Sequence, residues 1–374
     1  MVELNESFWR DRSVFVTGHT GFKGGWLTAW LLEMGARVAG YALAPDTRPS
    51  YFELCGLGRR MASIIGDVLD RSALERAIIS SAPEVIFHLA AQPLVRRSYQ
   101  QPAATFATNI MGTVNVLEAA RKLESVRAII VVTSDKCYYP VPATNGYTEQ
   151  DRLGGFDPYS ASKACAEIVT FAYTQSFFDQ SPARVGAATV RAGNVIGGGD
   201  WAEDRIVPDA IRALERGEIL TVRNPDAIRP WQHVLEPLTG YLMLAERLYE
   251  DGAKWSGAWN FGPSPDSEIT VGNLADLLVA HWGAGSWRHD TESAASPETV
   301  VLRLDSAKAL RQLGWRRRLS ISDAVRLSVN WYRAARPEDA GTCYRMSIGQ
   351  IQSYERLPST FYQKPQTASA AIRS

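Results

Sequence analysis

Two short stretches of the chain carry side chains that can move protons and stabilise charge. An apolar run ends directly before Ser134, Asp135 and Lys136, which place a hydroxyl, a carboxyl group and an amine in succession. Tyr159 and Lys163 are spaced so that both would lie on one face of a helix. An ammonium beside a phenol stabilises the phenolate and lowers the phenol pKa from about 10. We therefore expect one catalytic site in which Tyr159 is a base for alcohol oxidation.

Neither stretch is diagnostic alone, because polar residues after an apolar run also fit a solvated turn, and a tyrosine and a lysine at this spacing are common by chance. A glycine-rich segment near the start of the chain favours the catalytic interpretation. Ser13–Thr17 predicts a buried strand, Gly18–Gly25 a tight turn, and Trp26–Met34 a helix that ends at Gly35. This is the setting of a dinucleotide fingerprint, in which N–H groups at the helix N-terminus bind a pyrophosphate. Taken alone, the segment also fits a turn without a ligand.

Five further apolar segments predict strands, and helical segments separate them. This alternation predicts an α/β fold with a parallel, doubly wound sheet of the Rossmann type. We expect the sheet in residues 1–190, with a returning segment at about 232–262. A smaller, discontinuous α/β domain for the substrate is expected from 191–231 and 263–357, followed by a mobile tail at 358–374. The five strand segments are 36–42, 62–68, 83–92, 126–132 and 184–191.

The longest helical pattern covers residues 102–122, whose apolar face predicts either core packing or a subunit contact. We expect the protein to be a homo-oligomer. Shorter helical patterns are predicted at 204–216, 233–249, 270–282 and 321–332, and the one at 233–249 is expected to return to the large sheet.

The composition excludes several classes of function. Forty basic residues balance forty acidic ones, so no net field attracts nucleic acid or a membrane surface. No apolar run approaches the ~20 residues that span a bilayer, and the charged N-terminus lacks the apolar stretch of a signal peptide. Four scattered cysteines and five histidines without ligand spacing argue against a metal site or a disulfide framework. We expect a cytoplasmic protein that binds no metal.

The glycine spacing, G-x-x-G-x-x-G in Gly18–Gly24, is similar to that of the short-chain dehydrogenase/reductase superfamily. The longer string Thr-Gly-His-Thr-Gly-Phe-Lys-Gly and the later turn His88–Gln92 resemble its extended branch, which contains nucleotide-sugar epimerases and dehydratases. The resemblance implies a Rossmann fold, bound NAD and a nucleotide-sugar substrate. It implies cofactor contacts from Gly18, Thr20, Gly21, Phe22, Lys23, Gly24, Asp67, Val68, Leu89, Ala90, Ala91, Tyr159 and Lys163.

Two points about the cofactor stay open in the sequence. The strand at 36–42 ends without the acid that usually bonds the adenosine ribose of NAD, and the loop that follows holds Asp46 and Arg48, so NADP is not excluded. Asp67 either meets the adenine edge, as the resemblance implies, or caps the helix that follows. His88 is expected to pack rather than to react.

Asp135 and Lys136 distinguish two branches of the family. Epimerases usually carry small or hydroxyl residues at these positions, whereas 4,6-dehydratases carry an acid–base pair, most often Asp-Glu. The chain therefore resembles the 4,6-dehydratases, and CDP-glucose as the substrate is implied by resemblance alone. The segments that carry this resemblance are 134–138, 156–163, 191–201 and 229–241.

The resemblance implies a role for each catalytic residue. Tyr159 takes the proton of the sugar C4 hydroxyl, with Lys163 beside it, while Ser134 bonds the developing keto oxygen. Asp135 is the acid that protonates the C6 hydroxyl, and Lys136 is either the base at C5 or a charge that steadies the enolate. Substrate contacts are expected from Gln92, Asn194, Arg205 and Arg229.

Two rival interpretations remain at this stage. A nucleotide-sugar 4-epimerase has the same fold, although Asp135 and Lys136 argue against it. A cofactor-binding sensor without turnover has the same fold too. Such sensors often lose the tyrosine or the lysine, and Tyr159 and Lys163 are both present here.

Overall fold

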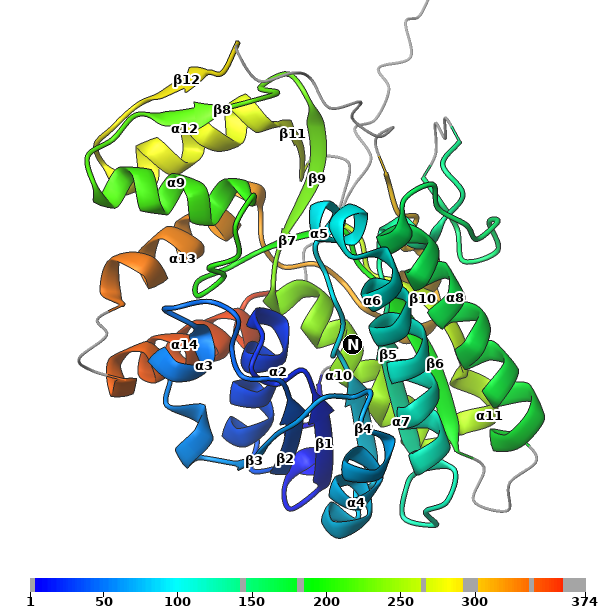
Figure 1. Ribbon diagram of the computed structural model, residues 1–374. Coiled ribbons are helices and arrows are strands. Elements are labelled where there is room, and N and C mark those ends of the chain that lie inside the picture. The colour runs from blue at the N-terminus through cyan, green and yellow to red at the C-terminus, as the bar shows by residue number, and fades with distance from the viewer. Residues whose placement is uncertain are drawn as a thin grey trace, which may run out of the picture.

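The computed structural model describes residues 4–141, 146–179, 185–263, 267–291, 302–335 and 340–358. Its largest unit is a parallel sheet of seven strands in the order β3-β2-β1-β4-β5-β6-β10 (Figure 1). The chain order reverses between β1 and β4, so the sheet is doubly wound, which confirms the predicted fold class. The strands are β1 (Ser13–Thr17), β2 (Arg37–Ala42), β3 (Ala62–Ile65), β4 (Val85–His88), β5 (Ala128–Val132), β6 (Gly186–Arg191) and β10 (Gly257–Asn260).

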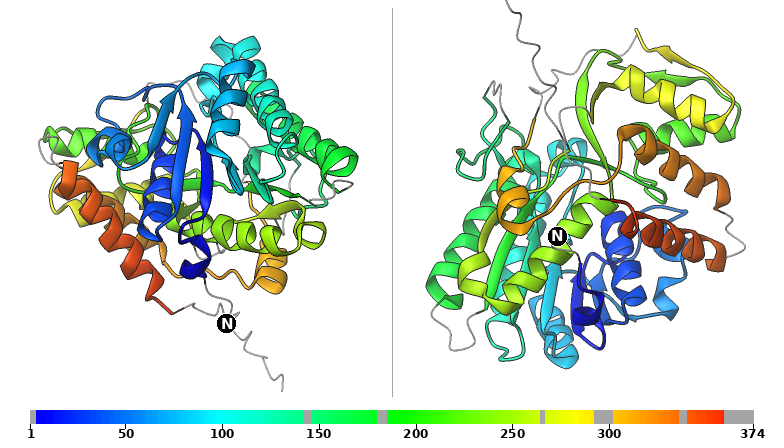
Figure 2. Two further views of the ribbon diagram at one scale, coloured as in Figure 1. Left: turned by 90° about the horizontal axis from the view of Figure 1, so that it is seen from below. Right: turned by 180° about the vertical axis from the view of Figure 1, so that it is seen from behind.

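Helices cover both faces of this sheet, because successive strand residues point to opposite sides and both sets are apolar. Val14 and Val16 belong to a core formed with α2 and α10, whereas Phe15 belongs to a second core formed with α4 and α7. Figure 2 shows these layers from two further sides. The helices of this part are α1 (Glu6–Trp9), α2 (Phe22–Glu33), α3 (Tyr51–Leu54), α4 (Arg71–Ser81), α5 (Val95–Gln100), α6 (Pro102–Phe106), α7 (Gly112–Ala120), α8 (Pro158–Tyr173), α10 (Leu235–Glu250) and α11 (Gly252–Trp255).

Two small sheets and three helices form the second part, which lies beside the glycine-rich turn. The two parts touch there, since a Cβ on Gly197 would lie 3.0 Å from the ring of Phe22. One sheet has the order β11-β9-β7, and the other pairs β12 with β8. Their strands are β7 (Asn194–Ile196), β8 (Leu220–Val222), β9 (Ile228–His233), β11 (Glu268–Thr270) and β12 (Trp287–His289), and the helices are α9 (Ile206–Glu215), α12 (Val271–Trp282) and α13 (Ile321–Ala334).

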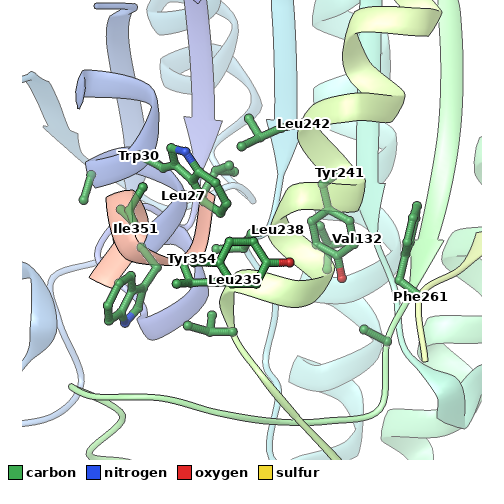
Figure 3. Close-up of a cluster of buried hydrophobic side chains, with 14 of the residues drawn as sticks. Leu27, Trp30, Val132, Leu235, Leu238, Tyr241, Leu242, Phe261, Ile351 and Tyr354 are labelled. Atoms are coloured by element: carbon green, nitrogen blue, oxygen red, sulfur yellow. The ribbon is translucent and has the colours of Figure 1, made fainter. Parts of the chain in front are cut away.

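The last helix, α14 (Ala340–Glu355), was not predicted, and it packs against α2, α3 and α13. The indole of Trp30 donates to Glu355 Oε1 at 2.8 Å, and the Tyr354 hydroxyl donates to the buried Glu236 Oε2 at 2.8 Å. In Figure 3 the apolar side chains of α2, α10 and α14 meet in one cluster beside the sheet. Helix α14 therefore helps to hold α2, whose N-terminus borders the candidate site. Residues 359–374 of the expected tail lie outside the described residues.

Helix boundaries differ from the prediction at two places that matter for the site. The helix predicted at 102–122 contains a π-helical turn, η2 (Ala107–Met111), between α6 and α7. Within this turn, the Asn109 side chain accepts the Gln92 N–H at 2.8 Å and donates to Ser162 Oγ at 2.8 Å, so it serves two other segments. Helix α9 begins at Ile206, which makes Arg205 its N-cap residue and not part of its first turn. No helix in the described ranges is long and apolar enough to cross a membrane.

Candidate active site

The glycine-rich turn between β1 and α2 packs too closely for side chains at two of its glycines. Gly18 has φ +77°, and a Cβ there would lie 2.7 Å from the backbone nitrogen of Ala90. A Cβ on Gly24 would overlap the carbonyl oxygen of Gly18. By contrast, a Cβ on Gly21 would meet only that same oxygen, at 3.4 Å. The open side of Gly21 is therefore where a pyrophosphate can approach the backbone.

A buried chain of hydrogen bonds fixes the exit of β4 next to this turn. Thr17 Oγ1 lies 2.7 Å from His88 Nδ1 and accepts the N–H groups of Leu89 and Ala90 at 3.2 Å each. His88 Nε2 lies 3.1 Å from Thr113 Oγ1, and burial lowers the pKa of His88 to about 3. His88 is therefore a neutral bridge between two threonines that shapes the backbone beside the turn.

The end of β5 brings Ser134 and Asp135 into the interior, with 6% and 4% of their surfaces exposed. Ser134 caps the single turn η3 (Asp135–Cys137) by accepting the N–H of Lys136 at 3.2 Å. Its hydroxyl also donates to Asp135 Oδ1 at 3.0 Å. Lys136 is half-buried, and its amine has no hydrogen bond or ion pair with any residue in the described ranges. The hydroxyl and the carboxyl group are thus fixed, whereas the amine is not.

Helix α8, with Asp157 as its N-cap, presents Tyr159 and Lys163 to this strand end. The Tyr159 phenol lies near the Ser134 hydroxyl, which acts to lower the pKa of Tyr159. Lys163 Nζ donates to the carbonyl oxygen of Val132, the last residue of β5, at 2.9 Å. The structure therefore brings together the two stretches that the sequence singled out.

The structure reverses the expected direction of the tyrosine pKa. Burial raises the pKa of Tyr159 to about 12, and Asp135 adds to the rise, whereas the Ser134 hydroxyl and the charge of Arg205 act in the opposite direction. The expectation that Lys163 lowers the pKa of Tyr159 below 10 is wrong when only the residues of the protein act on the phenol. Desolvation of the phenolate outweighs the nearby positive charges. Burial also lowers the pKa of Lys163 to about 8. Tyr159 needs additional positive charge beside it to act as a base near neutral pH.

Two cations face the acid and the phenol from other elements. Burial lowers the pKa of Lys23, on the first turn of α2, to about 8, and its amine interacts with the charges of Arg205, Asp135 and Asp200. Arg205 donates to Asp200 Oδ2 at 2.7 Å, and its charge also acts on Tyr159. Two positive charges therefore border the site, and such groups bind phosphate oxygens.

Asn194 and Arg229, also predicted to bind substrate, lie on neighbouring strands. In the parallel pairing of β7 with β9, Asn194 stands opposite Trp231. Its amide nitrogen lies 3.5 Å from the carbonyl oxygen of Pro230, the residue after Arg229. Both side chains are half-buried. The structure thus brings the two residues close together, and their contact with substrate stays a prediction.

The side chains of Gln92 and Asp67 form hydrogen bonds with other residues of the protein. The Gln92 amide donates to the Leu94 carbonyl at 3.1 Å and to Thr105 Oγ1 at 2.9 Å, and its oxygen accepts the Leu94 N–H at 2.7 Å. A substrate contact from this amide requires the exchange of one of these bonds. Asp67 accepts an N–H of its own turn at 2.9 Å, and Asp70 is the cap of α4, so the alternative that Asp67 caps this helix is wrong.

Sequence reasoning missed two acids that hold the site together. Asp200 pairs with Arg205, but no local pattern marks it. Glu167 lies one further helical turn beyond Tyr159 and Lys163 on α8, and it is 4% exposed. The continued spacing of four residues was the signal that could have found it.

Comparison with known proteins defines the class of the molecule. The model of the NAD dependent epimerase/dehydratase family matches residues 14–262, and the chain belongs to this family. Its cofactor is therefore NAD, and the turn fits it, since Gly18 and Gly24 leave no room for side chains while Gly21 stays open to a pyrophosphate. We expect the residues of the turn, the exit of β4, Tyr159 and Lys163 to hold NAD, and these contacts stay a prediction.

Individual relatives show which members of this family the chain is similar to. The chain is 48% identical over 355 residues to the CDP-glucose 4,6-dehydratase of Salmonella typhimurium, which covers 94% of this chain and 99% of the relative. A dTDP-glucose 4,6-dehydratase from Streptomyces venezuelae, solved with NAD, has a TM-score of 0.72 at 24% identity and covers 86% of this chain and 96% of its own. The UDP-glucose 4-epimerase of Thermotoga maritima, solved with UDP-glucose, has a TM-score of 0.71 at 22% identity, with coverage of 86% and 98%. These two structures support the fold alone.

Proposed function

We propose that the chain is a CDP-glucose 4,6-dehydratase, which converts CDP-D-glucose to CDP-4-dehydro-6-deoxy-D-glucose and water. The observation that carries this proposal is the buried carboxyl group of Asp135, which accepts a hydrogen bond from Ser134 beside Tyr159. An epimerase needs only the hydroxyl and the phenol, since it oxidises and reduces one carbon. A dehydratase must also protonate a leaving hydroxyl, which a positioned carboxylic acid can do. The 48% identity to a CDP-glucose 4,6-dehydratase supports the same assignment.

The proposed reaction begins at the C4 hydroxyl of the glucose. Tyr159 takes its proton, and Ser134 donates a hydrogen bond to the oxygen that becomes the ketone. NAD, when bound, supplies the acceptor for the C4 hydride and the donor that returns it to C6. The charge of Arg205 lowers the cost of ionising the Tyr159 phenol, whose pKa burial raises to about 12, and the positively charged ring of NAD would add to this effect.

The second half of the reaction removes water across C5 and C6. The ketone makes the C5 proton acidic, and Asp135 protonates the C6 hydroxyl, which leaves as water. Lys136 either takes the C5 proton and returns it to C5 when the hydride reaches C6, or steadies the enolate that forms. The amine of Lys136, half-buried beside fixed neighbours, suits either role, and Lys136→Met tests whether it takes part in the elimination.

The roles of the two domains, the oligomeric state and the cellular location belong to the same proposal. Residues 1–190 with 232–262 would hold NAD, while 191–231 and 263–357 would hold the nucleotide-sugar, with contacts from Asn194, Arg205 and Arg229. A homo-oligomer is supported by Ile168 and Phe171 on α8, which are 57% and 65% exposed. A cytoplasmic location is supported by the four cysteines, none of which forms a disulfide bond within the described residues.

The test is incubation with CDP-, UDP-, dTDP- and GDP-glucose, followed by mass spectrometry. The proposal predicts loss of water from CDP-glucose and at least about 10-fold slower loss from the other three, which corresponds to about 1.4 kcal/mol of discrimination. Loss of water from another nucleotide-sugar alone would correct the substrate. Inversion at C4 without loss of water would favour the epimerase instead.

A further inference from the structure

A buried ion pair lies directly behind the catalytic residues. Glu167 on α8 and Arg191 at the end of β6 have side chains that are each 3% exposed. They form a two-pronged contact, in which Arg191 Nε donates to Glu167 Oε1 at 2.9 Å and Nη2 donates to Oε2 at 2.7 Å. Two charges removed from water cost several kcal/mol each, so a pair of this kind is weak evidence for stability. Its position suggests another role.

The pair connects both halves of the site. On the redox side, Glu167 continues the helical face of Tyr159 and Lys163, and its charge acts on the Lys163 amine. On the acid side, Glu167 Oε1 accepts the hydroxyl of Thr133, the residue before Ser134. One carboxylate therefore touches the helix that carries the phenol and the strand end that carries the acid.

The backbone on either side of Arg191 borders the acid from the opposite side. The Thr133 N–H donates to the Val190 carbonyl at 3.0 Å, and the Asp135 N–H donates to the Ala192 carbonyl at 3.3 Å. The ends of β5 and β6 are therefore bonded to each other at the residues before and after Arg191. Gly193, two residues after Arg191, borders the acid closely, because a Cβ there would lie 2.9 Å from Asp135 Oδ2. A shift of the 191–193 backbone would therefore move the Asp135 carboxyl group.

The network also reaches past the pair to the last strand of the sheet. Arg191 Nη1 donates to the Tyr138 hydroxyl at 2.6 Å, which in turn donates to Asn260 Oδ1 on β10 at 2.8 Å. Every polar atom of the Glu167 carboxylate is thus bonded, and Arg191 is anchored to two further elements. This satisfies the condition under which a buried polar network rigidifies its surroundings.

We propose that the Glu167–Arg191 pair is a positioning unit that holds Asp135 at a fixed distance from Tyr159, so that acid and base act on neighbouring carbons of one sugar. The proposal rests on the proposed dehydratase function. In the proposed mechanism Glu167 and Arg191 do not touch the reacting atoms. They act through Thr133 and Gly193. A displacement of about 1 Å at a reacting group can cost 10²-fold in rate, so a loosened strand end should be visible in kcat.

The test compares two substitutions that remove one hydrogen bond each from the same carboxylate. Thr133→Val removes the bond from the strand end to Glu167 Oε1, whereas Thr189→Val removes the bond from the middle of β6 to Glu167 Oε2, a bond of 2.5 Å. Both threonines are buried, at 6% and 3% exposure, and valine matches their shape. Glu167→Gln is a harsher third variant, which leaves Arg191 buried without a countercharge.

The proposal predicts that Thr133→Val lowers kcat for loss of water at least about 10-fold with KM changed less than about twofold, because positioning is lost and binding is kept. Thr189→Val should keep kcat within about twofold, while the Tm of both variants falls by a similar amount. Equal kcat values for the two variants, or a loss of rate that follows Tm alone, would overturn the proposal and leave the pair a structural one.

The unsubstituted protein separates this proposal from the proposed function. If it reduces bound NAD with CDP-glucose but releases no water, the dehydratase assignment fails. The two threonine variants are then compared by the rate of that reduction, measured from nicotinamide absorbance in a single turnover. A slower reduction in Thr133→Val alone would show that the pair positions the strand end at Ser134 relative to Tyr159, and equal rates would reject a positioning role.

Discussion

Substitution of Gly24 by alanine should destabilise the fold, because the new methyl group would overlap the carbonyl oxygen of Gly18. That oxygen cannot retreat freely, since it accepts the N–H of Gly21 at 3.1 Å within the turn. Overpacking typically costs about 1–3 kcal/mol, and a fixed backbone atom places this case at about 3 kcal/mol. With an unfolding entropy of about 0.8 kcal/mol/K for a chain of 374 residues, Tm should fall by about 4 °C.

Gly21→Ala is the matched variant, because its methyl group would lie 3.4 Å from the same oxygen and otherwise in the open. Tm should fall by about 1 °C or less, while the Kd for NAD should rise at least about 10-fold, since the methyl group stands where the pyrophosphate approaches. Calorimetry measures both quantities, as Tm by scanning and as Kd by titration. Unchanged NAD binding in Gly21→Ala, or an unchanged Tm in Gly24→Ala, would refute this description of the turn.

Three other predictions concern the site and its surroundings. Tyr159→Phe removes the oxygen that takes the C4 proton, so reduction of bound NAD should slow at least about 10²-fold in stopped-flow absorbance, and an unchanged rate would remove Tyr159 from this role. Lys136→Met should still oxidise C4 but form no dehydrated product by mass spectrometry; full product formation would exclude Lys136 from the elimination. Burial lowers the pKa of His233 from 6.5 to about 3, so below pH 6.5 the unfolded chain binds a proton that the folded protein does not, and stability falls by about 1.4 kcal/mol per pH unit. His233→Phe should therefore flatten the decline of Tm below pH 6.5, and a decline as steep as in the unsubstituted protein would contradict the neutral assignment.

The large sheet and the meeting of the two catalytic stretches could be predicted because they depend on local patterns. Apolar runs mark the strands, glycines mark the turn, and the four-residue spacing of Tyr159 and Lys163 marks a helix face. The carboxyl ends of parallel strands share one edge, so strand order alone brings Ser134 towards the cofactor turn. These features need no knowledge of side-chain contacts.

Features that depend on distant contacts were not predictable in the same way. The pKa of Tyr159 follows from burial, which the sequence does not display. Asp200 matters only because Arg205, predicted to contact the substrate, pairs with it. The amide of Gln92 is used within its own loop, and α14 has no pattern that points to α2 as its partner. Each of these facts becomes visible only when the packing is known.

The most direct test of the central claim uses CDP-glucose that carries deuterium at C4. In the proposed mechanism Tyr159 and Asp135 act on neighbouring parts of one sugar, while one hydride travels from C4 to C6. The product should therefore lack one water and retain the deuterium at C6, which mass spectrometry and NMR can locate. A product without loss of water, or a dehydrated product whose deuterium has exchanged with solvent, would contradict the account.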